Sequence, residues 1–186
     1  MTDPTALPTP DPVPLVVQIV PMRRRHLRSV LRIEELAYPR PWSMSLFLSE
    51  LALRTTRAYV VARVGREVVG YAGLMLTGED AHVTTISVDP AWQRRAVGTR
   101  LMLALAHASR SRDAHNLTLE VRRTNLAAQH LYRRFGFAPV GVRKNYYPEV
   151  NEDALVMWVH GIDTDEYAEL LTGIERGIRG QTVWAQ

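Results

Sequence analysis

The chain has 186 residues, an apolar fraction of 46% and a formal net charge of +4, a composition typical of a one-domain globular protein. Because the sequence contains no cysteine, it excludes disulfides, thiolate metal sites and a cysteine nucleophile, and it fits a reducing cytoplasm. No apolar run approaches the roughly 18 residues of a membrane-spanning helix, so we expect no membrane contact.

The first segment, residues 1–14, is rich in proline and lacks the charged-then-apolar order of a signal peptide. This composition predicts a disordered proline-rich lead-in. Residues 15–160 are expected to form the folded domain, and residues 161–186 a C-terminal helical extension.

Arginine supplies nearly all of the positive charge, because Lys144 is the one lysine. The arginines concentrate in residues 23–32, 94–100 and 122–143. Such clusters are most simply solvated surface. The alternative is an attraction for polyanions, either cofactor phosphates or an RNA-rich neighbourhood.

The first half of the chain predicts two helices among four strands. Residues 24–38 have apolar side chains at helical spacing and end before Pro39. Ser43 is a suitable N-cap for a second helix that runs to about Leu53. A hairpin turn is expected at residues 65–67. Apolar or alternating runs predict strands at residues 16–20, 58–64, 68–76 and 81–88.

The second half predicts three helices and three strands. Helices are expected at residues 97–110, at 125–135, where Gly136 takes the C-terminal glycine position, and within 163–180. The last of these helices packs either on the domain or on a partner. Strands are expected at residues 117–121, 137–142 and 154–159. This order of elements predicts a mixed α/β sheet with helices on both faces.

Residues 89–100 form a basic turn between a strand and a helix. The first backbone N–H groups of a helix have no intrahelical partner and carry partial positive charge, so they can hold a phosphate. With Gly98 as its one glycine, the turn matches neither the Walker pattern nor the dinucleotide fingerprint. The sequence therefore predicts an anion site of another kind.

Residues 117–137 contain side chains that have ordinary structural explanations when taken alone. Glu120 is then a carboxylate at a sheet edge, Asn125 a helix N-cap and Tyr132 a core residue. The scattered histidines are likewise expected to be structural or exposed, because none has convincing metal-ligand spacing.

Taken together and in order, several segments resemble known motifs. Gln93-Arg94-Arg95-Ala96-Val97-Gly98 resembles the Gln/Arg-x-x-Gly-x-Gly/Ala signature of the Gcn5-related (GNAT) acetyltransferases, which cradles the pyrophosphate of acetyl-CoA. Residues 119–137 resemble the second half of the GNAT core. Further segments resemble the branch of bacterial ribosomal-protein alanine N-acetyltransferases (the RimI type), namely Pro41-Trp42-Ser43 with Phe47, Lys144-Asn-Tyr-Tyr-Pro148 and residues 152–157. The resemblance covers residues 16–159.

The resemblance implies a GNAT fold, a three-layer α-β-α arrangement around a mixed central sheet of about seven strands. It implies direct acetyl transfer from acetyl-CoA to an amine, with Glu120 as base, acting through water, Tyr132 as acid, and no metal. The strand before the turn is expected to pair with the pantetheine arm. Cofactor contacts are expected from Ile86, Ser87, Val88, Arg94, Arg95, Ala96, Val97, Gly98, Thr99 and Asn125. Acceptor contacts are expected from Trp42, Tyr146 and Tyr147, with Glu34 nearby.

Two residues of the acceptor side have alternative explanations, core packing for Trp42 and surface exposure for Glu34. Ala96 stands where the signature has its first glycine, and we expect right-handed helical angles there, so that alanine fits. If the residue instead needs a positive φ, alanine costs about 1–2 kcal/mol.

The expected acceptor is the N-terminal alanine of a small-subunit ribosomal protein, or another protein or peptide amine, and no direct nucleic-acid binding is required. One alternative is an acetyltransferase for a lysine side chain, a polyamine or an antibiotic. Another is a non-catalytic CoA-binding module. An RNA-binding accessory protein is a third, which rests only on the arginines.

Overall fold

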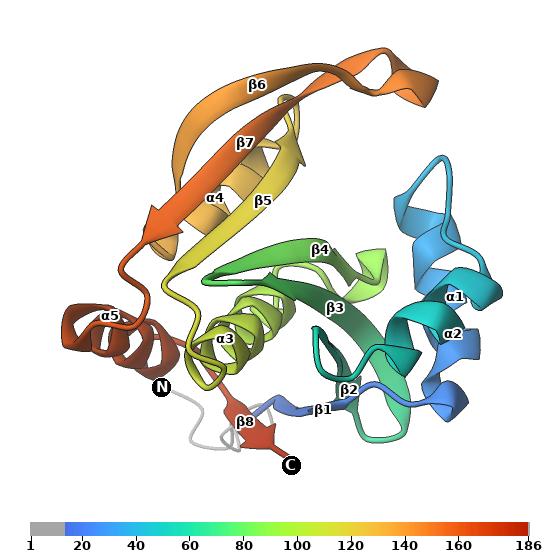
Figure 1. Ribbon diagram of the computed structural model, residues 1–186. Coiled ribbons are helices and arrows are strands. Elements are labelled where there is room, and N and C mark those ends of the chain that lie inside the picture. The colour runs from blue at the N-terminus through green and yellow to red at the C-terminus, as the bar shows by residue number, and fades with distance from the viewer. Residues whose placement is uncertain (1–13, 186) are drawn as a thin grey trace, which may run out of the picture.

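The computed structural model describes residues 14–185, which form a mixed sheet of eight strands with helices on both faces (Figure 1). The proline-rich lead-in predicted for residues 1–14 falls outside this range apart from Pro14. The strand order is β6-β7-β5-β4-β3-β2-β1-β8, and only the pairs β4–β5 and β1–β8 are parallel. The strands are β1 (Val16–Pro21), β2 (Arg57–Val64), β3 (Glu67–Thr77), β4 (Asp80–Val88), β5 (Asn116–Arg122), β6 (Ala138–Tyr147), β7 (Glu152–His160) and β8 (Gln181–Trp184).

The expected number of about seven strands is corrected to eight by β8, for which the sequence carried no signal. β8 pairs in parallel with β1, from Val16↔Gln181 to Ile19↔Trp184. A strand of four residues is too short to be recognised from its own alternation, and it forms because β1 offers unpaired backbone groups along that edge. The other seven predicted strands are present, and β6 extends further along β7 than predicted.

Two helices cover one face of the sheet. α1 (Leu27–Ala37) and α2 (Met44–Ala52) pack their apolar sides on β2, β3 and β4. Val30, Ile33 and Phe47 are fully buried in the core between them and the sheet. A short 3-10 turn, η1 (Arg24–His26), leads into α1.

The opposite face is covered by α3 (Val97–Arg110), α4 (Leu126–Arg134) and α5 (Asp165–Arg176). These helices share a second core with the sheet, to which they contribute buried residues such as Leu101 and Leu171. Helices on both faces confirm the predicted three-layer arrangement (Figure 1). Two further 3-10 turns are η2 (Pro90–Trp92) and η3 (Pro148–Val150).

Three local predictions about helix ends are confirmed. The Ser43 hydroxyl accepts a hydrogen bond from the Leu46 N–H at 3.2 Å, and the Asn125 side-chain oxygen accepts one from the Ala128 N–H at 3.1 Å. Gly136 has a φ of +83°, the left-handed conformation that ends a helix most easily with glycine.

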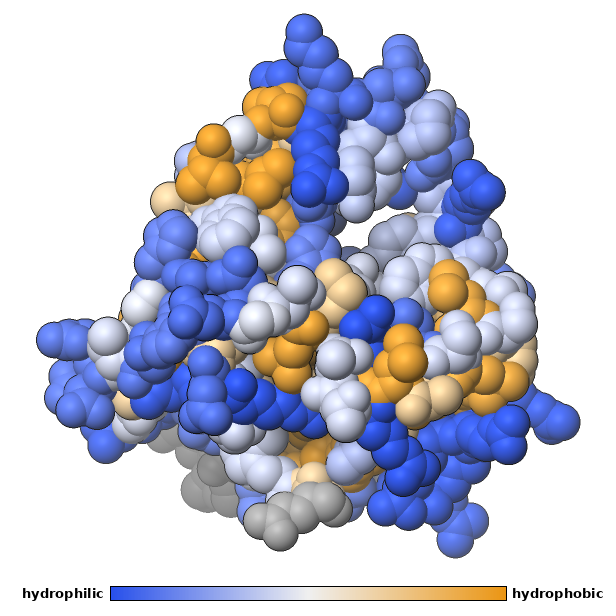
Figure 2. All heavy atoms as spheres, in the orientation of Figure 1, coloured by the Kyte–Doolittle hydropathy of each residue, from blue (hydrophilic) through white to orange (hydrophobic). Residues whose placement is uncertain are grey.

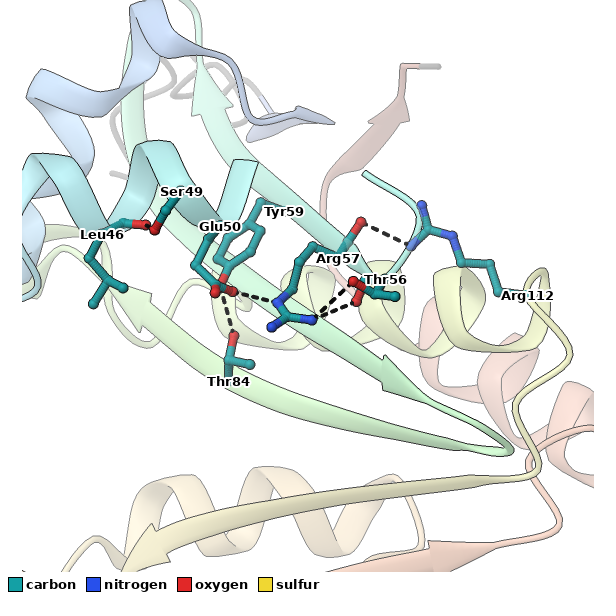
Figure 3. A network of polar contacts seen from close by, with 8 residues as sticks. All are labelled: Leu46, Ser49, Glu50, Thr56, Arg57, Tyr59, Thr84 and Arg112. Atoms are coloured by element: carbon teal, nitrogen blue, oxygen red, sulfur yellow. Dashed lines mark hydrogen bonds and ion pairs between the residues drawn. The ribbon is translucent and has the colours of Figure 1, made fainter. Parts of the chain in front are cut away.

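A polar network ties α2 to the sheet (Figure 3). The Glu50 carboxylate accepts hydrogen bonds from Arg57 Nε at 2.7 Å and from the Tyr59 hydroxyl at 2.8 Å. The same hydroxyl lies 3.2 Å from the Thr84 hydroxyl on β4. Because these side chains come from α2, β2 and β4, the network fixes the helix across three elements.

β4 carries a β-bulge at Thr84. Val83 pairs with Leu74 and Thr85 pairs with Gly73, so Thr84 has no partner on β3. A bulge bends its strand and increases the local twist.

The bulge also reverses the alternation of side chains along β4. Before it, Ala81 and Val83 are buried in the core beneath α3; after it, Ile86 and Val88 pack against that core. Thr84 and Thr85, which lie between Val83 and Ile86, are consequently turned toward the α1 side of the sheet.

β4 and β5 separate just before this bulge. They share three residue pairs, the last of which is His82↔Thr118. β4 nevertheless continues to Val88, while β5 continues to Arg122 paired with β7 alone. The two central strands therefore diverge within the sheet (Figure 1).

A buried arginine connects the C-terminal elements to α3. Arg100 is fully buried, and its guanidinium donates to Thr182 Oγ1 at 2.9 Å, to the Arg179 carbonyl at 2.8 Å and to the Arg95 carbonyl at 3.1 Å. The connection from α5 to β8 is thus held against the turn that precedes α3.

Candidate functional site

The separation of β4 from β5 leaves one edge of β4 without a strand partner among the described residues beyond His82. Ile86, Ser87 and Val88, which were predicted to meet the cofactor, lie along this edge. Their backbone groups can pair with an extended ligand as with an added strand. One of these groups, the Ile86 carbonyl, accepts a hydrogen bond from the Tyr38 hydroxyl at 3.2 Å. A space-filling view shows an opening between the β5–β7 part and the part formed by β4 and α1 (Figure 2).

The basic turn after β4 presents an exposed anion site. Arg94 and Arg95 are exposed, and the Arg95 guanidinium lies 5.0 Å from the centre of the Trp92 ring. Whereas α2, α4 and α5 begin with a capping side chain, α3 begins at Val97 without one. The first N–H groups of α3 therefore remain available to a phosphate.

The remaining predicted residues of this turn can contact a ligand only through their backbone. Val97 and Thr99 are buried, with exposed fractions of 1% and 5%. Gly98 is half-buried, and an added Cβ would lie 3.4 Å from Leu131, an ordinary contact distance. The protein's own packing thus leaves room for a Cβ at Gly98, and its predicted contact with a cofactor stays a prediction.

Asp89 holds the start of the turn in place. Its carboxylate accepts from Arg32 Nη1 at 2.7 Å and from the Ala91 N–H at 3.0 Å. Burial opposes ionisation, but these two hydrogen bonds outweigh it and hold the pKa of Asp89 below its usual value. The turn is therefore anchored to α1 by a charged pair.

The expectation that Ala96 adopts right-handed helical angles is wrong. Its φ is 58° and its ψ is 19°, a left-handed conformation, and Arg94 in the same turn has a φ of 60°. Left-handed residues turn successive backbone N–H groups toward one side and so create an anion-binding concavity. This geometry favours glycine, and alanine adopts it at a cost of about 1–2 kcal/mol.

Glu120 projects from β5 just beyond the last pair with β4. One carboxylate oxygen lies 3.2 Å from His82 Nε2 and the other 3.2 Å from Arg143 Nη1, and the side chain is 6% exposed. The hydrogen bond from His82 outweighs the effect of burial, and Arg143 adds to it, so that the pKa of Glu120 lies below its usual value. The carboxylate is therefore ionised at neutral pH.

Tyr132 projects from α4 into the core, and its ring centre lies 5.9 Å from that of Phe137. Burial raises the pKa of Tyr132, and Tyr38 and Tyr147 raise it further. Tyr147 is in turn influenced by Tyr38 and by Glu120: burial is the main cause that raises the pKa of Tyr147, and both neighbours add to it. The roles predicted for Glu120 and Tyr132 stay predictions, because no hydrogen bond joins the two side chains.

Tyr146 and Tyr147 form an aromatic corner at the end of β6. Their ring centres are 5.1 Å apart with the planes at 90°, and Tyr146 is 42% exposed. The Arg143 guanidinium lies 5.5 Å from the Tyr146 ring centre and that of Arg122 lies 5.0 Å from the Tyr147 ring centre. The predicted contact of these two tyrosines with an acceptor stays a prediction.

The alternative explanation for Glu34, surface exposure, is wrong. Glu34 is 2% exposed, and it accepts hydrogen bonds from the Trp42 N–H at 3.0 Å and from the Tyr71 hydroxyl. Burial raises the pKa of Glu34 to about 7, although the Trp42 N–H acts against it. The Trp42 ring packs on Phe47 at 5.3 Å. Core packing therefore accounts for the known contacts of both residues, and contact with an acceptor remains a prediction.

Two residues of the opening were missed in the sequence. Tyr38 is the last residue of the range in which apolar side chains predicted a helix, and only its position at the helix end, before Pro39, marks it as different. His82 meets Glu120 because β4 and β5 pair there, which no local pattern reveals. Asn125 is exposed and its side-chain oxygen caps α4, so its predicted cofactor contact stays a prediction.

Within residues 14–185, no group of three or more histidine or acidic side chains is arranged to hold a metal ion. No helix in this part of the chain is long and apolar enough to cross a membrane.

An open strand edge followed by a turn and an uncapped helix start can bind an extended ligand that carries phosphate groups. Residues 27–137 match the model of the Acetyltransferase (GNAT) family. The chain belongs to this family and is an N-acetyltransferase.

Named relatives agree with this assignment. The chain is 42% identical over 121 residues to the N-alpha-acetyltransferase RimI of Mycobacterium tuberculosis, covering 63% of this chain and 74% of that protein. It is 33% identical over 133 residues to the [ribosomal protein bS18]-alanine N-acetyltransferase of Salmonella typhimurium, covering 70% and 88%. The crystal structure of the ribosomal-protein-S18-alanine N-acetyltransferase from Escherichia coli superimposes with a TM-score of 0.71 at 29% identity, covering 78% of this chain and 94% of that one.

The strain of the left-handed Ala96 belongs to the folded backbone itself, so its relief should affect folding more than binding. We expect Ala96→Gly to raise the free energy of unfolding by up to about 1 kcal/mol, because the strain relieved exceeds the added entropy of the unfolded chain. Urea denaturation measures this change. Ala108→Gly, within right-handed α3, is the control and should lower the free energy by about 1 kcal/mol. An Ala96→Gly variant that is no more stable, or that binds CoA more than about tenfold tighter, would contradict this account.

The raised pKa of Glu34 predicts a stability that depends on pH. Between the ordinary value of 4.5 and about 7, folded Glu34 keeps a proton that the unfolded chain has lost. The folded state then binds more protons, so the stability falls as pH rises through this range, by on the order of 3 kcal/mol.

Glu34→Gln keeps the shape and removes the titration. Unfolding free energies measured between about pH 5 and about pH 8 should fall less steeply for this variant than for the wild type. Glu35→Gln alters the exposed neighbouring glutamate and should leave the wild-type slope unchanged. If the unfolding free energy of Glu34→Gln fell with pH as steeply as that of the wild type, Glu34 would not be the group whose raised pKa causes the fall.

Proposed function

We propose that the protein transfers the acetyl group of acetyl-CoA to the α-amine of the N-terminal alanine of ribosomal protein bS18. The observation that carries the proposal is the ionised Glu120 carboxylate, held at the diverging edge of β4 beside the exposed aromatic corner of Tyr146 and Tyr147. The acceptor in this proposal is taken from the relatives, whose names give ribosomal protein bS18. The ordinary state of an α-amine near neutral pH is largely protonated, so an acceptor of its proton is needed before attack.

Glu120 is the base in this proposal. Its low pKa keeps it ready to accept a proton, and the arriving ammonium replaces Arg143 as the partner of one carboxylate oxygen. The same low pKa makes it a weak acceptor, so the proton leaves through water or through the imidazole of His82, which is 25% exposed. His82 thus acts as a positioning residue that holds the carboxylate and opens a route to solvent.

Tyr132 stabilises the leaving thiolate in this proposal. A phenol whose pKa is raised keeps its proton, so its main contribution is a hydrogen bond to the sulfur as the C–S bond breaks, with proton transfer completing the step. The amine nitrogen forms its bond to the acetyl carbon in the same reaction, without an acyl-enzyme, since the sequence has no cysteine.

The cofactor would lie along the open edge of β4. Its pantetheine arm pairs with the backbone of residues 86–88, and a backbone N–H near Ser87 or Val88 donates to the carbonyl oxygen, which gains charge during attack. The pyrophosphate then meets the N–H groups at the start of α3, with Arg94 and Arg95 beside it. Asn125 at the start of α4 completes the set of contacts.

An acetylation assay over short peptides that differ in their first residues tests this function. We expect release of CoA thiol with an Ala-started peptide of the bS18 N-terminus, and a mass increase confined to its α-amine. The same assay with a blocked N-terminus, a lysine peptide, a polyamine and an aminoglycoside tests the alternatives. Thiol release with one of these and none with the Ala-started peptide would overturn the acceptor, and no release with any would favour a binding module.

Two substitutions test the assigned roles. Glu120→Gln should lower turnover most near neutral pH and leave CoA affinity nearly unchanged, while Tyr132→Phe should lower turnover by a factor on the order of 10²–10⁴. The matched controls are Glu149→Gln, an exposed carboxylate on η3, and Tyr167→Phe, a buried phenol on α5 that bonds the Phe135 carbonyl. Full activity of Glu120→Gln would remove the base assignment, and an unchanged rate in Tyr132→Phe would reduce that residue to packing.

A further inference from the structure

A basic hollow lies apart from the opening between β4 and β5. It has a volume of about 310 Å³ and is lined by Arg25, His26, Ser29, Arg63, Arg66 and Val68. These residues come from η1, the first turn of α1 and the β2–β3 hairpin, on the α1 side of the sheet. None of them belongs to the proposed acetyl-transfer site.

The positive charge of the hollow is not neutralised by the protein. Within residues 14–185, Arg25, Arg63 and Arg66 form no ion pair. The acidic residue beside the hollow in sequence, Glu67, accepts a hydrogen bond from the Trp92 indole at 3.3 Å. Charges that converge in this way stabilise a bound anion.

Guanidinium groups of the lining lie near the His26 imidazole. Burial lowers the pKa of His26, and Arg25, Arg63 and Arg23 lower it further, in that order. Two of these groups are also held in place: Arg63 Nη2 donates to the Gly65 carbonyl at 3.1 Å, and Arg25 Nε lies 3.3 Å from His26 Nε2. These two hydrogen bonds restrain the guanidinium groups that line the hollow.

Phosphate is the anion that fits this chemistry. Guanidinium groups pair with phosphate oxygens through two parallel hydrogen bonds, and they are less strongly hydrated than ammonium groups. The volume is at the lower end for a ligand site, and Val68 is the one apolar residue of the lining, so an apolar ligand does not fit.

The rim indicates more than one phosphate. Arg23, Arg24 and Arg28, which precede, begin and follow η1 in the sequence, are exposed, and none of them forms an ion pair among the described residues. Strongly hydrophilic residues dominate the surface over η1 and the β2–β3 hairpin at the lower right of Figure 2. Several unpaired charges close together in the sequence suit a chain of phosphates better than a single ion.

We propose that this hollow binds the phosphodiester backbone of RNA, with one phosphate inside it and neighbouring phosphates along η1. The choice of RNA among polyphosphates rests on the proposed function, because a ribosomal protein acceptor is itself a protein that binds RNA. The hollow would then position the enzyme beside its acceptor without taking part in acetyl transfer.

Binding of the full-length protein to a fluorescently labelled single-stranded oligouridylate, followed by anisotropy over a range of salt concentrations, tests the proposal. Neither acetyl-CoA nor peptide is present, so failure of RNA binding and failure of acetyl transfer are separate results. The triple variant R25Q/R63Q/R66Q should bind at least about tenfold more weakly, and its slope of log K against log salt should be shallower by about 2.

The triple variant R54Q/R134Q/R176Q removes the same charge from exposed positions elsewhere and should keep the wild-type salt slope. Unchanged thermal unfolding would show that R25Q/R63Q/R66Q is folded; if it is not, the single variant R66Q, on the exposed hairpin, should show a slope shallower by about 0.7. NMR titration of the His26 imidazole should show its pKa rising when RNA is added.

An equal loss of RNA affinity in the two triple variants would overturn the proposal, because net charge alone would then explain binding. Binding of inorganic phosphate at His26 without binding of the oligouridylate would also overturn it, because the hollow would then be a site for small anions.

Discussion

The short pairing between β4 and β5 is the constraint on which the rest of the structure depends. The strands share three residue pairs and separate after His82↔Thr118, and the bulge at Thr84 follows at once. A longer parallel pair would have consumed the backbone groups of β4 that remain open. Because the strands diverge, Glu120 lies on β5 just beyond the last residue pair with β4, where His82 and Arg143 contact its carboxylate.

Two largely buried glutamates, Glu34 and Glu120, have pKa values that are shifted in opposite directions. Glu34 is surrounded by hydrogen-bond donors that carry no charge, so desolvation dominates and raises its pKa. Glu120 is also largely buried, but His82 and Arg143 contact its two oxygens, and they outweigh desolvation. The partners, and not the depth of burial, decide which carboxylate remains ionised.

Much of the fold could be predicted because the signals are local. Ser43 and Asn125 cap helices within three residues, and Gly136 ends a helix through its own backbone. Seven strands followed from alternation. β8 and the bulge at Thr84 could not be predicted in this way, because each is defined by its pairing with a neighbouring strand.

By itself, the sequence determined the order of elements, the family resemblance and the types of residue available for chemistry, because helix ends, alternation and spaced motifs are written in residues close along the chain. The tertiary structure alone decided that Ala96 is left-handed and that Glu34 is buried. At Ala96, the Arg100 guanidinium donates a hydrogen bond to the carbonyl of the preceding residue, Arg95. The tertiary structure alone also decided that His82 meets Glu120 across two strands. These features depend on atoms from segments far apart in sequence, whose distances no local pattern contains.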